Sequence, residues 1–250
     1  MLPDFCLRLA VGLLGCLLLL SPIQSARPAP GTRPLVSANF FRTMFLVALG
    51  FCVGAGLWLW PDIPPPLLVC LAAASVLALA GSVTWSLERS PGGVSLIVAS
   101  VGVLVAALYL RDPTSLAGGL SAALLLGAAT GSMLLGHNYL ITPTMSMTPL
   151  FRLLAALAVA LALRAGLDGF ALLRWTSNHS MASLKGDLAL WLPVRWAVGI
   201  VAPAVLCWMA WQTARIRSTQ SATGILYVVV VFCFLGELTG QLLRAAGLTF

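Results

Sequence analysis

Charged residues are scarce in this sequence. Asp, Glu, Lys and Arg make up 8% of its 250 residues, whereas a typical soluble domain contains about 25%. Hydrophobic residues make up 60%, and the mean hydropathy is +1.01. A chain with so little polar surface cannot cover a water-soluble globule of this length. This scarcity excludes a soluble fold, and we expect an integral membrane protein.

The motifs of common enzymes and nucleic-acid-binding proteins are also missing. The sequence has two histidines and no P-loop, H-E-x-x-H or G-x-S-x-G motif. Its six cysteines form no C-x-x-C pair and lie in apolar runs, as small buried hydrophobic residues do. The basic residues are dispersed singly, which excludes a nucleic-acid-binding tract. We therefore expect no ordinary catalytic metal site, and nothing supports an enzyme that acts on its own.

Long apolar runs predict an all-α bundle of transmembrane helices. A helix needs about 20 predominantly apolar residues to cross a bilayer. Proline, glycine and charged residues separate the runs, and tryptophan and tyrosine lie near their ends, at the depth that these rings prefer. We predict a single transmembrane domain over residues 1–250, with eight spans at 6–24, 40–60, 65–86, 93–111, 115–137, 149–175, 189–211 and 220–243.

The first run also has the length of a signal-peptide core. However, Asp4 precedes Arg8, the only early basic residue, and Gln24-Ser25-Ala26 is a poor cleavage site. We expect this helix to be retained; cleavage would leave seven spans.

The distribution of basic residues favours one orientation. With eight spans, one side of the membrane carries seven basic residues and the other five, with Arg195 left out because it lies deeper. Basic residues favour the cytoplasmic side, so both termini are expected outside the cytoplasm. The seven are Arg27, Arg33, Arg42, Arg89, Arg152, Arg215 and Arg217.

Small residues predict where helices approach each other closely. Gly119, Ala123, Gly127 and Gly131 repeat every four residues in the fifth span, and a glycine pair at 50 and 54 does so in the second. Such stripes allow close backbone contact in lipid. We expect packing within the chain, with a subunit interface as the alternative.

Four charged residues lie at least six residues from the ends of their expected spans: Arg164, Asp168, Arg195 and Glu237. Each costs about 2.5–3.5 kcal/mol in lipid, so such groups face a bundle interior and pair. Because successive helices alternate in direction, all four are expected in the same half of the membrane. Two interpretations remain open. One is a structural ion-pair network, and the other is a polar cavity for a quinone headgroup, a proton path or an anionic solute.

A second candidate region follows the fifth span. His137, Asn138 and Tyr139 could contact a ligand, although a structural histidine at the membrane interface is the simpler interpretation. Met145 and Met147 would permit a copper site with His137, against the alternative that both methionines only pack. Bis-histidine haem is not expected, because His179 follows the sixth span and falls on the other side of the membrane.

Gly236-Glu237-Leu238 near the end of the last span, Arg195 in the span before it and the eight-span plan together resemble a known family. They resemble the membrane anchor subunits of dimethyl-sulfoxide and polysulfide reductase complexes. The resemblance covers the last quarter of the chain. It implies passage of electrons between quinol and an attached iron–sulfur subunit, usually without a cofactor in the anchor itself.

The leading hypothesis is therefore a non-catalytic subunit of a respiratory complex in a bacterial cytoplasmic membrane. It would contact quinone through Glu237, Arg195, Arg164 and His137, and its partners would be lipid and the other subunits. A small proton- or anion-coupled transporter and an assembly or scaffold protein are the alternatives.

Overall fold

The structure, a computed structural model, describes residues 1–25, 36–87, 92–142, 145–178 and 187–245. These residues form helices joined by short links, and they contain no strand. The elements in chain order are α1 (Leu2–Ser25), α2 (Ala38–Leu59), α3 (Pro65–Ser86), α4 (Gly93–Arg111), a 3₁₀ turn (Pro113–Ser115), α5 (Leu116–Ile141), α6 (Thr148–Asn178), α7 (Asp187–Trp196), a π-helix (Ala197–Val201), α8 (Ala202–Arg215) and α9 (Thr219–Ala245).

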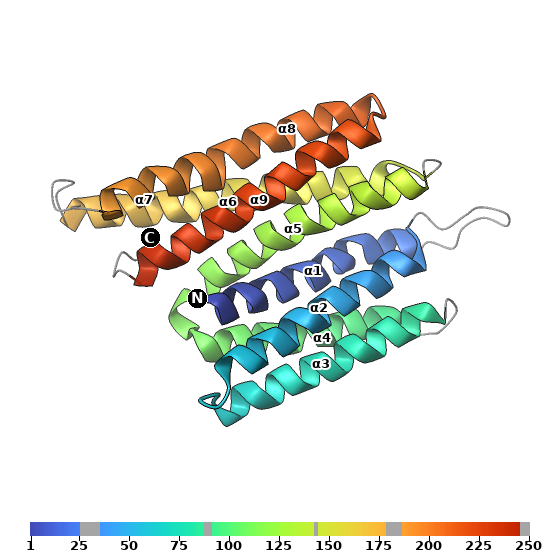
Figure 1. Ribbon diagram of the computed structural model, residues 1–250, viewed down its shortest axis with the longest axis horizontal. Helices are drawn as coiled ribbons and strands as arrows, with labels where there is room; N and C mark the ends of the chain where they lie inside the picture. The colour runs from blue at the N-terminus through green and yellow to red at the C-terminus, as the bar shows by residue number, and fades with distance from the viewer. Residues whose placement is uncertain (26–35, 88–91, 143–144, 179–186, 246–250) are drawn as a thin grey trace.

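Within these described ranges, eight helical segments are long and apolar enough to cross a membrane. The predicted all-α transmembrane bundle is confirmed, and each predicted span has its counterpart. The seventh span, Leu190–Arg215, is continuous through α7, the π-helix and α8. Successive spans run in opposite directions, so that the start of α1 and the end of α9 lie at the left-hand end of the bundle in Figure 1. We call this end the terminal end.

The first and fifth spans form the centre of the bundle. In each, 72% of the most apolar window is buried, compared with 28% in the fourth and seventh spans. Helix α1 packs against α2, α4 and α5, and α5 packs in turn against α6 and α9 (Figure 1). The segment that resembles a signal-peptide core therefore lies inside the bundle, between its two halves.

Glycine allows this central contact. A Cβ atom on Gly12 of α1 would lie 1.9 Å from the carbonyl oxygen of Ala123, and one on Gly127 would lie 2.1 Å from the carbonyl carbon of Gly12. Gly119 and Gly131 of the same stripe meet side chains of neighbouring helices. The predicted stripe thus packs within the chain, where small residues permit close helix approach.

The glycine pair of α2 behaves differently. A Cβ atom on Gly50 or Gly54 would meet nothing within 4 Å, and both residues are exposed. The expectation that this pair packs closely within the chain is wrong, because the spacing of glycines does not decide which face of a helix turns inward.

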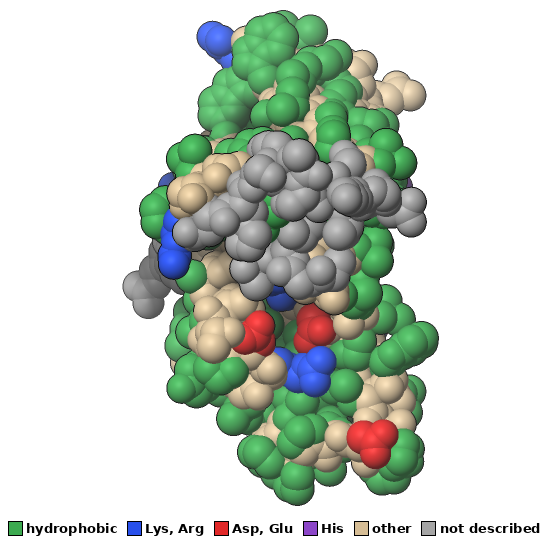
Figure 2. Space-filling view, turned by 90° about the vertical axis from the view of Figure 1, so that its left-hand side faces the viewer, with side chains coloured by type: hydrophobic (Ala, Val, Ile, Leu, Met, Phe, Trp, Pro, Cys, Tyr) green, Lys and Arg blue, Asp and Glu red, His purple; other side chains and the backbone are tan. Residues whose placement is uncertain are grey.

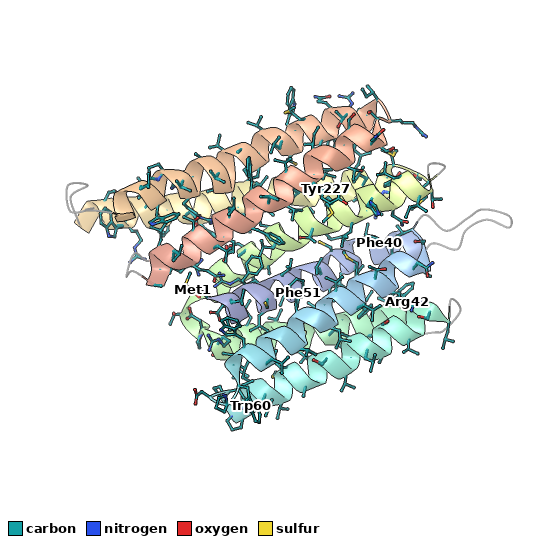
Figure 3. The ribbon with its side chains drawn as sticks, viewed as in Figure 1. Met1, Phe40, Arg42, Phe51, Trp60 and Tyr227 are labelled. Atoms are coloured by element: carbon teal, nitrogen blue, oxygen red, sulfur yellow. The ribbon has the colours of Figure 1, made fainter. Side chains whose placement is uncertain are left out.

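Helix α2 illustrates the outer surface of the bundle. Figure 3 places Phe40 and Arg42 near one end of this helix, Phe51 in its middle and Trp60 beyond its other end. Leu57 is 73% exposed, as expected of an apolar side chain that faces lipid rather than water.

The seventh span contains an irregular turn. The N–H of Ala202 donates to the carbonyl oxygen of Ala197, five residues earlier, which is the π-helical pattern. Pro203 follows at once and has no N–H to donate, so the ordinary α-helical ladder is interrupted at this point. The turn begins two residues after Arg195, and its Gly199 lies against α9.

Candidate functional site: a buried ion-pair network beside a cavity

The structure brings together Arg164 and Asp168 of α6, Arg195 of α7 and Glu237 of α9. It adds Arg8 of α1, which pairs with Glu237. We call these five residues the ion-pair network. All are buried, with exposed fractions between 0% for Glu237 and 6% for Asp168. The network therefore connects the first, sixth, seventh and eighth spans inside the bundle.

Glu237 is the centre of one half of the network. Its Oε1 accepts hydrogen bonds from Arg8 Nη1 and, at 3.2 Å, from the side-chain amide of Gln241. Its Oε2 accepts from Arg164 Nη2 at 3.1 Å. Both carboxylate oxygens are thus engaged by protein donors, so the side chain is held in one orientation.

Asp168 is the centre of the other half. Its Oδ2 accepts from Nε and Nη2 of Arg195 at 3.0 and 2.6 Å. Its Oδ1 lies 3.4 Å from Nε of Arg164. Arg164 also donates through Nη1 to the carbonyl oxygen of Gly118 and the hydroxyl of Ser121, both on α5, and so fixes α6 against the central helix.

The sequence of α9 makes room for these guanidinium groups. Gly236 lies against Gly199 of the π-helix, where a Cβ atom on Gly236 would come within 2.3 Å of the Gly199 Cα. This approach lets Arg195 Nη1 donate to the Gly236 carbonyl oxygen at 2.6 Å. Gly240, one turn later, lies beside the Arg195 guanidinium. Gly236 and Gly240 have no side chains and so leave space for the Arg195 guanidinium. Glu237 and Gln241, also one turn apart, supply the polar side chains of α9.

The charges of the network do not cancel. Three arginines face two carboxylates, so the network carries one excess positive charge within the bundle. Uncompensated charge in a low-dielectric interior is costly. An anion in reach of the network would remove that cost.

A cavity of about 360 Å³ adjoins the network at the terminal end of the bundle. We call it the terminal cavity. Figure 2 faces this end, and basic and acidic side chains gather there around a hollow beside the grey atoms. The charged and amide side chains that line the cavity are Asp4, Arg8, Arg111, Asp112, Gln241 and Arg244.

Both carboxylates of the terminal cavity already have partners. Asp4 accepts from Arg111 at 2.9 and 3.4 Å. Asp112 accepts from the hydroxyls and backbone N–H groups of Ser115 and Thr114. These bonds hold the pKa of Asp112 below its usual range, and the bond from the Ser115 side chain has the largest effect. The acids therefore leave Arg8 and Arg244 as cations that face the cavity without a lining carboxylate of their own.

Three residues of this site are not predicted from the sequence: Arg8, Gln241 and Ser121. Arg8 counts as a topology signal near the chain start, although its place inside an apolar run is the same signal that identifies Arg195. Gln241 stands four residues after Glu237, hence on the same helical face. Ser121 has no signal in the sequence, because only the packing of α6 on α5 brings Arg164 to it.

His137, Asn138 and Tyr139 lie at the opposite end of the bundle from the network. His137 is 16 residues beyond Ser121 on the same helix, which corresponds to about 24 Å. It borders a separate cavity of about 350 Å³ between α2 and α5, where the Asn138 amide donates to the Ser37 hydroxyl. Tyr139 is buried and donates to the carbonyl oxygen of Ser146. The structure therefore does not bring His137 together with Glu237, Arg195 and Arg164, and quinone contact at either place stays a prediction.

The copper and haem alternatives have different outcomes. Neither Met145 nor Met147 is among the residues that line the cavity at His137, and Met147 packs into the hydrophobic core. This arrangement favours the interpretation that these methionines pack. His179, the alternative haem ligand, lies outside the described residues.

Comparison with known proteins gives no match to a family model, to a curated protein or to a solved structure.

Proposed function

We propose that this protein binds an anionic solute at the terminal end of its bundle, as a small anion-coupled transporter does. One observation carries this proposal: the network holds three buried arginines against two carboxylates and adjoins a cavity lined by further arginines. A buried excess of positive charge, next to a space that a solute can enter, favours an anion over a cation or a neutral molecule.

The network itself supplies a rigid frame rather than a proton carrier. Both oxygens of Glu237 are engaged by Arg8, Arg164 and Gln241. A carboxylate in this position holds the arginines at fixed places. The anion would then meet a preorganised positive surface, which reduces the cost of ordering the site on binding.

Uptake into proteoliposomes tests this proposal. Purified protein would be reconstituted in neutral lipid and assayed with radiolabelled phosphate, glycerol 3-phosphate and succinate under an imposed potential. We expect uptake of at least one of these anions by the wild type and a reduced rate for Arg244→Gln. Arg42→Gln is the matched control, because it removes an exposed arginine of α2 at the end of the bundle opposite the terminal cavity. If none of the three anions enters vesicles above the protein-free level, the transport proposal is wrong.

A membrane anchor subunit of a respiratory complex is the second candidate. The observation in its favour is that Arg195 donates to Gly236 and so joins the two parts of the sequence that resemble the reductase anchors. In this role Glu237 would organise arginines rather than exchange protons with quinone, because its oxygens are occupied. A quinone headgroup would have to approach from the terminal cavity.

Affinity purification from native membranes distinguishes the two candidates. Mild detergent would preserve a complex, and mass spectrometry would identify the proteins that co-purify. Stoichiometric recovery of an iron–sulfur or cytochrome subunit supports the anchor role. Recovery of the chain alone, with anion uptake in vesicles, supports transport. A purified chain that is alone and inactive in uptake would instead support the scaffold alternative.

A further inference from the structure

Three buried polar atoms around the terminal cavity have no hydrogen-bond partner among the described residues: Nε of Arg8, Nε of Arg244 and Oε1 of Gln241. Arg8 is 5% exposed and Gln241 is 6% exposed. All three residues line the same cavity. Buried polar atoms in native proteins are nearly always paired, so unpaired ones around one space point to a missing partner.

The unpaired donors have a definite chemistry. Both are guanidinium N–H groups, whose planar forks match the oxygens of a phosphate better than a halide ion. They come from α1 and α9, and Arg111 of α4 adds a third guanidinium to the lining. Arg111 is bonded to Asp4 and Arg8 to Glu237, so Arg244 is the arginine of the lining that has no ion pair among the described residues.

The size and depth of the cavity restrict the class of ligand further. A volume of about 360 Å³ is larger than a single ion needs and leaves room for a headgroup or a small ester. The cavity lies at an end of the bundle, where Arg111 ends α4, and so at the depth of lipid headgroups. The free Oε1 of Gln241 is an acceptor, which suits a hydroxyl group next to the phosphate.

We propose that the terminal cavity binds a phosphate ester between Arg8 and Arg244, with Gln241 accepting from a neighbouring hydroxyl group. This inference rests on the anion-binding function proposed above and names its ligand class. The phosphate belongs either to an anionic lipid headgroup or to a soluble ester, since both present the same oxygens.

Binding to the full chain, stripped of lipid in mild detergent, tests the inference. Glycerol 3-phosphate would be titrated by calorimetry, and phosphatidylglycerol would be titrated by native mass spectrometry, with phosphatidylcholine as the lipid of no net charge. Binding of glycerol 3-phosphate supports a soluble ester. Binding of phosphatidylglycerol alone, in preference to phosphatidylcholine, supports a lipid headgroup.

Variants connect the binding to this cavity. Arg244→Gln should weaken the binding of the active probe about tenfold, as expected for the loss of one charge-assisted hydrogen bond. Arg244→Lys retains the charge without the fork and should lie between Arg244→Gln and the wild type. Arg42→Gln should bind as the wild type does. Arg244 makes no ion pair with the described residues, so its replacement leaves the network intact, and a thermal unfolding curve for each variant checks this.

Three results would overturn the inference in different ways. If succinate binds with dependence on Arg244 while both phosphate probes fail, the phosphate assignment is wrong and the anion-binding function stands. If phosphate, lipid and succinate probes all fail to bind, the anion-binding function fails as well. Equal binding by Arg244→Gln and the wild type would show that the phosphate binds elsewhere.

Discussion

Arg8 in α1 donates a hydrogen bond to Glu237 in α9, although the two residues are 229 positions apart in the chain. The contact joins the first span to the last in the interior of the bundle. Glu237 is also bonded to Arg164 of α6, so one carboxylate holds three spans together. Its removal should therefore affect the whole bundle rather than one helix.

Glu237→Gln is expected to lower the free energy of unfolding by about 3–5 kcal/mol, the usual cost of breaking a buried ion pair on one side. The substitution removes a negative charge, which leaves Arg8 without its counter-ion and Arg164 with Asp168 alone. Unfolding by a denaturing detergent, followed by circular dichroism, measures the change. Asp62→Asn, at an exposed position between α2 and α3, is the control and should leave stability unchanged. A variant as stable as the control would mean that the network contributes little to folding.

Arg195 and Asp168 are expected to couple strongly. Two hydrogen bonds join them, at 3.0 and 2.6 Å, so a double-mutant cycle with Arg195→Met and Asp168→Leu should give a coupling energy of about 1–3 kcal/mol.

The same double variant also distinguishes a structural role of this ion pair from a role in anion binding. A scaffold should keep its role once the charges are removed together, whereas an anion-binding protein should lose affinity with the arginine. Independent, additive effects of the two substitutions would contradict the observed pairing.

Gly12→Ala is expected to destabilise the bundle by about 1–3 kcal/mol, the range for inserting a methyl group into a packed interior. The added carbon would lie 1.9 Å from a backbone oxygen of α5, so the two central helices would have to move apart. Gly15→Ala on the same helix meets nothing within 4 Å and is the matched control. It should be neutral or stabilising, because alanine favours a helix more than glycine does. Equal effects of the two substitutions would show that α1 and α5 tolerate a wider separation.

The N-terminal helix is expected to be retained in the mature protein. It carries Arg8, and without it Glu237 would lose one of its ion pairs in the interior of the bundle. Mass spectrometry of the protein isolated from its native membrane should detect peptides that contain Arg8. Consistent recovery of chains that begin near residue 26 would contradict this expectation and would leave a seven-span protein.

The terminal end of the bundle is expected to face away from the cytoplasm. The opposite end carries the larger number of basic residues, among them Arg42 and Arg215, and such residues favour the cytoplasmic side. An alkaline phosphatase fusion at the C-terminus should be active, and one after Arg217 should be inactive. The reverse pattern would place the terminal cavity on the cytoplasmic side without changing its chemistry.

Part of the site could be predicted from the sequence because the rule behind it is local. Charged residues inside apolar runs must find partners in a bilayer, and alternating spans place residues of neighbouring helices at similar depths. Arg164, Asp168, Arg195 and Glu237 could therefore be grouped before any packing was known. The ion-pair partner of each arginine could not be predicted, because ion pairing depends on how helices rotate and tilt against one another.

Hydrophobicity along the chain determined the all-α class and the eight spans, since burying a helix in lipid depends on the length and composition of each run alone. Only the tertiary structure decided that the first span lies at the centre, that Arg8 completes the network and that His137 lies at the opposite end of the bundle from it. It also decided that one glycine stripe packs while the other faces outward. These outcomes depend on which helix faces meet. Lipid solvates every apolar face nearly equally well, so only the packing of the assembled bundle decides which face of each helix turns inward.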